Sequence, residues 1–381
     1  MILTVYAICF LLHFVIPARV VKGYCCDEDG VPLKYRLNGV VVYIIMTIFY
    51  SQLPRDYSIK LYDEFWSNLL IVNILGISAS IYFLIKGGKA KYFRCITVDQ
   101  IQIDDYKKSL TPAGLQPALL TRFFLGCEWN PRLGGVDIKM FLYLVGAVGL
   151  QLNILSCMVA HMELNDGKVS NAMAVYVALM GWFLTEYLLG EEVHLYTYDL
   201  FAEKIGFKLV WGCLVFYPFF YSISIAPLVS FRPSERSNSD LSPMAVAAIV
   251  GLFLSGWALT RGANMQKFWS RTQPQEKVVF FGLVQQRTLP GTRILVSGWW
   301  GLSRHINYLG EIVQAVAVAL PGCLVAQTPL LSLVPLLYPL YYLLLFVPRQ
   351  VDDDAVCRAK YGAVWDEYVK LVPYRICPGV W

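Results

Sequence analysis

The chain has 381 residues, of which 57% are hydrophobic and 15% are charged, and its formal net charge is +5. Soluble domains contain about 45–50% apolar and about 25% charged residues, so this composition excludes an ordinary soluble domain and favours a membrane protein. In a membrane protein a small positive net charge reflects how the chain is oriented across the bilayer, so no nucleic-acid partner is expected. The ten cysteines form no Cys-x-x-Cys pair, which argues against a zinc site, and no metal is expected.

Apolar runs recur along the whole chain, and a helix needs about 20 mostly apolar residues to cross a bilayer. In chain order the runs are 2–21, 40–53, 66–85, 140–159, 172–189, 209–230, 244–259, 311–326 and 329–347. Backbone polar groups in lipid must pair internally, so the runs are predicted to be helices, and no strand-like alternation is seen. We expect an all-α, polytopic membrane protein with about nine or ten transmembrane helices, forming one domain over residues 1–381.

Basic and acidic residues within or beside the runs carry further information. Arg19 and Lys22 follow the first run, whereas a signal peptide carries its basic residues before the apolar stretch, so we interpret 2–21 as a spanning helix. Glu186 is flanked on both sides by apolar residues. Ionisable groups at membrane depth usually face a protein interior or a wet cavity, which makes Glu186 a candidate functional residue. The cluster at 191–194 fits a helix end in the headgroup zone equally well.

Lys267 and Arg271 lie four residues apart in the basic segment 261–293. On a helix they share a face, where two cations can clamp a phosphate. From this segment alone, a helix end whose long side chains reach the headgroups explains the pair better than a phosphate clamp does. An excess of Lys and Arg marks the cytoplasmic side of a membrane, so we expect 261–293 and the tail from Arg349 to face the cytosol.

Two later segments combine aromatic, amide and charged side chains. Segment 298–311 places two tryptophans, then Arg, His, Asn and Tyr, directly before an apolar run. Aromatic faces can sandwich a heteroaromatic ring, and an amide can read its edge. An interfacial aromatic belt explains Trp299 and Trp300 but not the polar residues that follow. Segment 349–379 follows the last run and carries three consecutive carboxylates at 352–354, which a solvated amphipathic tail also explains.

Taken in order, these segments resemble the sterol reductase family, which reduces the delta-14 or delta-7 double bond of sterol precursors and includes the lamin B receptor. The family reads roughly RGANxQK, GWWGxxRHxNYxG, DxxxCxxKYGxxW and VPYRIxPG, and this sequence contains each pattern. Earlier, 35–39 resembles its YRxNG and 128–139 resembles its ExNPR…DxK. The match spans nearly the whole chain and is most like a delta(14)-sterol reductase, with delta(7) as the alternative.

The resemblance implies an NADPH-dependent oxidoreductase of sterol biosynthesis, located in the endoplasmic reticulum membrane as a multi-pass protein. Residues 1–260 would form mainly spanning helices, and 261–381 the cofactor-binding and catalytic part. The sterol would enter from the lipid side between helices, and the oligomeric state is not indicated. Carried over residue by residue, the implied NADPH pocket consists of Lys267, Arg271, Leu295, Trp300, Asn307, Tyr308, Arg349, Asp353, Cys357, Lys360, Tyr361 and Tyr368.

The expected chemistry requires an acid, because an isolated carbon–carbon double bond is a poor hydride acceptor. Protonation by a general acid would precede hydride delivery from the nicotinamide. The candidate catalytic residues are Asp353, Glu186 and Tyr308, with Asp353 as the proton donor and Glu186 as its support. On a helix Asp353, Cys357 and Tyr361 face one way, which we expect to be into the cofactor pocket.

Two departures from the family pattern leave other interpretations open. Phe183 stands where the family has a tyrosine that is expected to help protonation, and Val145 lies in a stretch, 141–147, that lacks the family's acid, Arg and Pro. A non-catalytic membrane scaffold of the same fold is therefore an alternative. An isoprenylcysteine-type methyltransferase using S-adenosylmethionine shares the RHxxYxG-like segment, but the RGANxQK and VPYRIxPG patterns argue against it.

Overall fold

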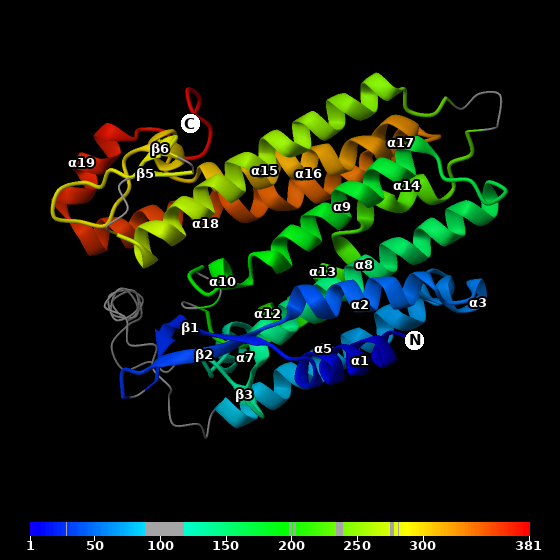
Figure 1. Ribbon diagram of the computed structural model, residues 1–381, viewed down its shortest axis with the longest axis horizontal. Helices are drawn as coiled ribbons and strands as arrows, with labels where there is room; N and C mark the ends of the chain where they lie inside the picture. Colours follow the sequence, from blue (N-terminus) through cyan, green and yellow to red (C-terminus); the bar gives the residue numbers. More distant parts are fainter. Residues whose placement is uncertain are drawn as a thin grey trace.

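The computed structural model describes residues 1–27, 29–87, 118–197, 200, 203–233, 239–274, 278–280 and 282–381. Seven of the described helices are long and apolar enough to cross a membrane. They are α5 (Phe65–Gly87), α8 (Ile138–Leu164), α9 (Asn171–Leu189), the compound helix α12 to α14 (Phe207–Val229), α15 (Pro243–Thr272), α16 (Ile306–Val325) and the compound helix α17 to α18 (Pro329–Tyr361). The helices run roughly alongside one another along the long axis of the molecule (Figure 1).

The described residues contain seven such helices where nine or ten were expected, because the first two apolar runs form shorter helices. Helix α1 (Ile2–Val15) has 14 residues and α2 (Gly39–Ser51) has 13. At 1.5 Å per residue these helices are only about 20 Å long, which is short of the about 30 Å hydrocarbon core. Pro17 lies two residues after the last residue of α1 and cannot supply the backbone N–H that a further helical turn needs.

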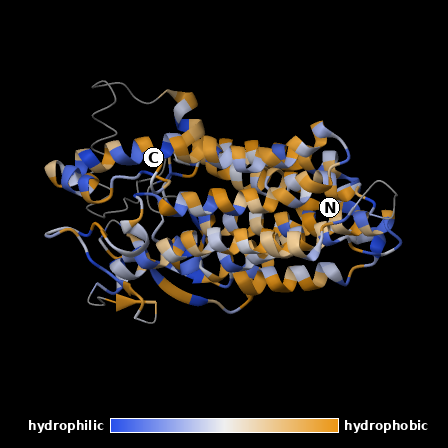
Figure 2. Ribbon diagram, turned by 90° about the horizontal axis from the view of Figure 1, so that it is seen from above, coloured by the Kyte–Doolittle hydropathy of each residue, from blue (hydrophilic) through white to orange (hydrophobic). Residues whose placement is uncertain are grey.

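Short strands occur outside the spans, although the sequence showed no strand-like alternation. The longest pair, β1 (Arg19–Cys26) and β2 (Pro32–Leu37), forms an antiparallel hairpin between α1 and α2. The pairs β3 (Arg132–Leu133) with β4 (Val136–Asp137) and β5 (Val278–Val279) with β6 (Val284–Gln285) have two residues per strand. The β1–β2 hairpin, α10 (Glu191–His194) and α19 (Ala363–Leu371) lie at the same end of the molecule (Figure 1). Figure 2 shows the hydrophilic residues gathered towards the two ends of a largely hydrophobic helical body.

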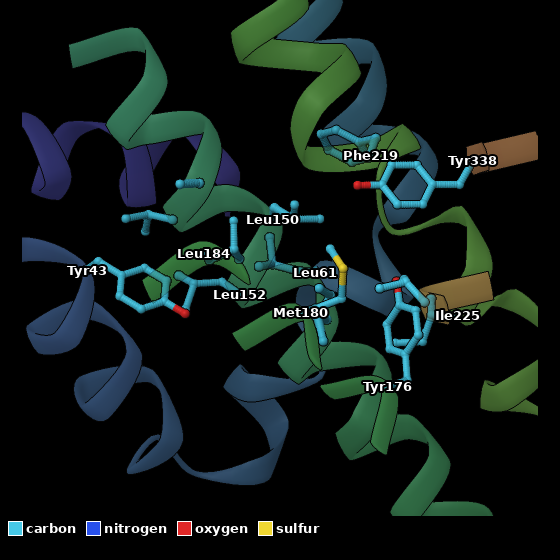
Figure 3. Packing of buried hydrophobic residues seen from close by; sticks show 14 of the residues in the cluster. Tyr43, Leu61, Leu150, Leu152, Tyr176, Met180, Leu184, Phe219, Ile225 and Tyr338 are labelled. Carbon is cyan, nitrogen blue, oxygen red and sulfur yellow. The ribbon is translucent and has the colours of Figure 1, made fainter. Parts of the chain in front are cut away.

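Helix α8 forms the centre of the hydrophobic core. Its side chains Leu150 and Leu152 are fully buried, and α1, α2, α9 and α13 (Tyr217–Phe220) pack around them. Figure 3 shows these leucines facing Met180 and Leu184 of α9. The outer helices instead leave large apolar side chains exposed, among them Leu344, as expected for surfaces that contact lipid.

Helices α15 and α16 approach closely because two glycines face each other across their contact. A Cβ added to Gly310 would lie 2.3 Å from Oγ1 of Thr260 and 2.6 Å from the carbonyl oxygen of Gly256. This close approach fixes the N-terminal end of α16 beside the C-terminal half of α15, where the predicted site residues lie.

Candidate active site

The C-terminal tail folds back and anchors the loop that leads into α16. The backbone N–H of His305 donates to the carbonyl of Arg375 over 2.8 Å, and the Oγ of Ser303 donates to the carbonyl of Ile376 over 2.8 Å. Oδ2 of Asp354, on α18, forms ion pairs with both Arg304 and Arg375, each at 3.5 Å. The start of α16 and the end of α18 are therefore tied together through the C-terminal tail.

Lys267 occupies the centre of this junction. Its Nζ lies 4.9 Å from the ring centroid of Trp300, whose indole N–H donates to the carbonyl of Ala263 over 2.8 Å. Arg271, Asp353, Cys357 and Arg349 all lie close enough to Lys267 to interact with it electrostatically. Lys267 is exposed, so its ammonium group is accessible to a ligand. Leu295 and Trp300 pack together in a small apolar cluster, which holds the Trp300 ring beside Lys267.

Tyr308 links α16 to α18. Its hydroxyl donates to Oδ2 of Asp353 over 2.9 Å. Its ring stacks between His305, at a centroid distance of 4.9 Å, and Phe346, at 4.3 Å. Burial, followed by the neighbouring cations Lys267 and Arg304, lowers the pKa of the His305 imidazole to about 3. The imidazole is therefore neutral at physiological pH, and the phenol is held in one orientation beside the carboxyl group.

The predicted residues on the last two helices, α18 and α19, form another side of the junction. Cys357 and Tyr361 of α18 pack against Tyr368 of α19 in one apolar cluster. Burial raises the pKa of the Tyr368 phenol, which therefore stays neutral. Lys360 lies 4.9 Å from the ring of Tyr361. The helical spacing predicted for Asp353, Cys357 and Tyr361 is thus observed on α18.

Arg271 contacts segments that the sequence did not connect with the site. Its guanidinium donates to the carbonyl of Tyr196 over 2.9 Å and lies 5.3 Å from the ring of Tyr24, on the β1–β2 hairpin. These two residues approach the end of α15 from the N-terminal half of the chain. No local pattern marks them in the sequence, since they meet Arg271 only in the folded structure.

Glu186 lies in a separate cavity and pairs with Arg261 of α15. The cavity has a volume of about 170 Å³ and lies among α8, α9, α10, α15 and α16, with His194, Glu311 and Gln314 also in its lining. Asp353 and Tyr308 do not line it. Glu186 was expected to support Asp353, but no direct contact between the two is found among the described residues. The Glu186 carboxylate pairs with Arg261 instead.

Comparison with known proteins places these features in a family context. Residues 1–381 match the ergosterol biosynthesis ERG4/ERG24 family. The chain belongs to this family. The sterol reductase resemblance inferred from the motifs is thereby confirmed, and the methyltransferase alternative is set aside.

Relatives of the family are found in bacteria, plants and fungi. The chain is 32% identical to a Delta(14)-sterol reductase of Methylotuvimicrobium alcaliphilum over 93% of this chain and 76% of the relative. It is 30% identical to the Delta(14)-sterol reductase of Arabidopsis thaliana over 96% of this chain and 91% of the relative. It is 32% identical to Delta(14)-sterol reductase ERG24 of Saccharomyces cerevisiae over 99% of this chain and 82% of the relative.

The junction of α15, α16 and α18 contains polar atoms that the protein itself leaves unsatisfied. Within the described part of the chain, buried polar atoms there have no hydrogen-bond partner. They include Oδ1 of Asn307, Nε2 of His305 and both amide atoms of Gln350. Buried polar groups are usually paired, so these atoms indicate a site for a polar ligand. Gln350 was not among the predicted residues, although it directly follows Arg349 in the same motif.

Proposed function

We propose that the chain is a delta(14)-sterol reductase that uses NADPH. The observation that carries this proposal is the Tyr308–Asp353 hydrogen bond beside Lys267, in a chain whose relatives above are named Delta(14)-sterol reductases. The Tyr308–Asp353 pair, which could deliver a proton, would then lie beside Lys267 and Trp300, which could contact the cofactor. The sequence patterns left delta(7) reduction open, and the names of the relatives favour delta(14).

The proposed cofactor pocket comprises the twelve residues named from the family resemblance. Lys267 and Arg271 would contact phosphates, Lys as a point charge and Arg through its planar fork. Trp300 offers an aromatic ring, and Oδ1 of Asn307 and the amide of Gln350 offer unpaired polar atoms for ring edges. When bound, the reduced nicotinamide would supply a hydride. The extra phosphate of NADPH would favour it over NADH at such a cationic site.

In the proposed mechanism Tyr308 and Asp353 deliver the proton. Asp353 can serve only in its protonated form, in which its O–H donates to the phenol oxygen while the phenol O–H donates to the sterol. The proton would form the new C–H bond at C15 with the π electrons, which would leave a tertiary cation at C14 for the cofactor's hydride to neutralise. Phe346 and His305 hold the phenol ring in place, and the apolar packing around it excludes water.

The proposed setting is the endoplasmic reticulum membrane, which agrees with the seven candidate spans. The sterol would reach the site laterally from the bilayer, because the exposed faces of the outer helices are apolar. Such entry requires no soluble carrier.

The proposal is tested with the purified full-length chain in detergent. We expect NADPH to bind much more tightly than NADH in calorimetry, no binding of S-adenosylmethionine, and reduction of a 14,15-unsaturated sterol at the expense of NADPH. Reduction of a 7,8-unsaturated sterol alone would replace delta(14) by delta(7). Binding of NADPH without reduction of either sterol would support a non-catalytic scaffold. Equal affinity for NADPH and NADH would contradict the proposal that the cationic residues recognise the extra phosphate of NADPH.

A further inference from the structure

Arg271, near the end of α15, is surrounded by phenols and by a second cation. Its guanidinium lies 5.3 Å from the Tyr24 ring, whose centroid lies 5.6 Å from that of Tyr196. The groups that interact with it electrostatically include Tyr24, Tyr361, Tyr196 and Arg293. A guanidinium group from a different segment thus lies close to Arg271, although the sequence patterns did not include Arg293 in the site.

A short, well-held loop presents Arg293. The backbone N–H of Leu289 donates to the carbonyl of Ile294 over 2.9 Å, and the N–H of Thr292 donates to the carbonyl of Leu289 over 3.0 Å. Leu289 and Ile294 pack in the same apolar cluster as Tyr361 of α18. Arg293 also interacts electrostatically with Tyr361. The fold therefore keeps this cation at the edge of the proposed cofactor pocket.

No protein carboxylate neutralises Arg293 among the described residues. Its side chain is exposed and forms no ion pair or hydrogen bond with the part of the chain that the structure describes. Arg304 and Arg375, at the same end of the molecule, both pair with Asp354. Two guanidinium groups that lie close together repel each other, and an anion between them replaces this repulsion with attraction. Arg271 and Arg293 are therefore suited to bind an anion together.

The position of the two arginines indicates which anion this is. Lys267 interacts electrostatically with Asp353, a member of the proposed proton-delivering pair. Arg271 follows Lys267 by four residues on α15, which is about 6 Å further along the helix axis. A phosphomonoester carries about −1.5 to −2 charges near neutral pH and has three acceptor oxygens, which suit two planar guanidinium forks. The pair would thus bind a phosphomonoester on a ligand that also contacts Lys267.

We propose that Arg271 and Arg293 bind the 2′-phosphate of NADPH, and that Arg293 determines the preference for NADPH over NADH. The inference rests on the proposed function, since it names the residues that recognise one group of the proposed cofactor. Tyr24 and Tyr196 act as positioning residues, because the Tyr24 ring and the Tyr196 carbonyl hold the Arg271 guanidinium. Lys267 would remain for the pyrophosphate.

The experiment measures binding, so it requires no sterol. Calorimetry with the full-length chain in detergent gives dissociation constants for NADPH, NADH, adenosine 2′,5′-bisphosphate and adenosine 5′-monophosphate, and for phosphatidic acid in mixed micelles. The variants are Arg293→Gln and Arg293→Lys. Arg287→Gln is the matched control, because the Arg287 side chain is likewise exposed and has no ion pair or hydrogen bond among the described residues.

Arg293→Gln should weaken the binding of NADPH and of the bisphosphate by about 10- to 100-fold, as the loss of a hydrogen bond between charged groups predicts. The affinities for NADH and the monophosphate should change little. Arg293→Lys keeps the charge but not the fork, so it should lose less. Arg287→Gln should match the unaltered chain. Thermal unfolding in detergent checks that all three variants fold, as expected for substitutions of exposed side chains.

Several results would overturn the assignment. Equal affinity of the unaltered chain for the bisphosphate and the monophosphate would do so, as would an Arg293→Gln variant that keeps the full preference for NADPH. An equal loss of affinity for NADPH and NADH would place Arg293 on a group that both dinucleotides share. Tighter binding of phosphatidic acid than of the bisphosphate, lost in Arg293→Gln, would assign the arginines to a lipid headgroup.

Failure of the proposed function would give a different result. A chain that selects the bisphosphate through Arg293 but reduces no sterol would retain the phosphate site and contradict the reductase proposal. A chain that reduces a 14,15-unsaturated sterol with NADPH, while Arg293→Gln keeps the full preference for NADPH, would contradict the phosphate site alone.

Discussion

Tyr308 and Asp353 lie 45 residues apart in sequence on two different helices, and their hydrogen bond depends on the positions of both helices. Sequence motifs named both residues, and the spacing of Asp353, Cys357 and Tyr361 predicted a shared face. The partner of Glu186 was not predictable, because Arg261 reaches it across a helix contact. Pairing between distant elements was thus the part of the site that the sequence left undetermined.

Replacement of Asp353 by Asn should separate proton delivery from cofactor binding. Asn keeps the shape of the side chain but removes the titrating proton, so reduction should fall by on the order of 100-fold or more while NADPH still binds. Steady-state kinetics and calorimetry on the same preparation measure the two effects. Asp366→Asn, at an exposed carboxylate paired with Arg358, is the control.

Two outcomes of this experiment would change the assignment of Asp353. A parallel loss of NADPH affinity would make it a cofactor ligand. Near-normal turnover would reject both roles and direct the same test to Glu186→Gln.

Glu191 gives a residue-level prediction of pH dependence. Burial raises the pKa of its carboxyl from 4.5 to about 7, against the opposing effect of the Gly39 backbone N–H that donates to it over 3.0 Å. The folded state therefore binds this proton more tightly than the unfolded state. Its stabilisation is present below pH 4.5 and is lost as pH rises towards 7, by about 3 kcal/mol in free energy of unfolding.

Glu191→Gln should remove this pH dependence. The variant should unfold at a higher temperature than the unaltered chain at pH 8, because Gln stays neutral and can still accept from Gly39. Thermal unfolding in detergent at pH 5 and pH 8 measures the difference. Glu192→Gln, at the exposed partner of Arg19, should retain the original slope. An unchanged slope in Glu191→Gln would show that other groups cause the dependence.

At the scale of elements, the contact between α15 and α16 determines the geometry of the site. Gly310→Ala should destabilise the chain by about 1–3 kcal/mol, because its Cβ would clash with Thr260 and with the backbone at Gly256. Thermal unfolding in detergent, together with NADPH affinity, measures the loss. Gly251→Ala, on the same α15, is the control, since nothing lies within 4 Å of its added Cβ. Equal stability of the two variants would contradict the close approach.

The long helices were predicted well and the short elements poorly. The run 66–85 predicted α5 (Phe65–Gly87), and 172–189 predicted α9 (Asn171–Leu189), because length and apolarity determine both in lipid. The β1–β2 hairpin was missed, since part of the first apolar run continues into β1 without polar alternation. Its pairing depends on the partner strand, which periodicity within one strand does not reveal.

At the scale of the whole molecule, the N-terminal half contributes to the candidate site. Arg271 contacts Tyr24 and Tyr196, both of which precede residue 260. The predicted division at residue 260 remains a prediction, and these contacts cross it. The end of the molecule that is proposed to bind the cofactor is built jointly by the β1–β2 hairpin, the segment after α10 and the last three spans.

Charge is distributed unequally between the two ends of the helical body. The end that carries the cofactor junction includes Lys267, Arg271, Arg287, Arg293, Arg304, Arg349, Arg358, Lys360 and Arg375. The loops and short helices at the opposite end include Arg55, Lys60, Lys168 and Arg232 among the described residues. Basic loops stay on the cytoplasmic side, so the cofactor end should face the cytosol, where the proposed NADPH would be available.

Glycosylation mapping tests this orientation, and the sequence contains no Asn-x-Ser/Thr acceptor, so any glycan reports an engineered site. An acceptor inserted after Arg287, or after the C-terminal Trp381, should remain unmodified in eukaryotic cells. One inserted after Lys168, in the turn between α8 and α9, should be modified, and it serves as the positive control. Modification after Arg287 without modification after Lys168 would invert the topology. The cofactor junction would then face the lumen, and the NADPH assignment would be untenable.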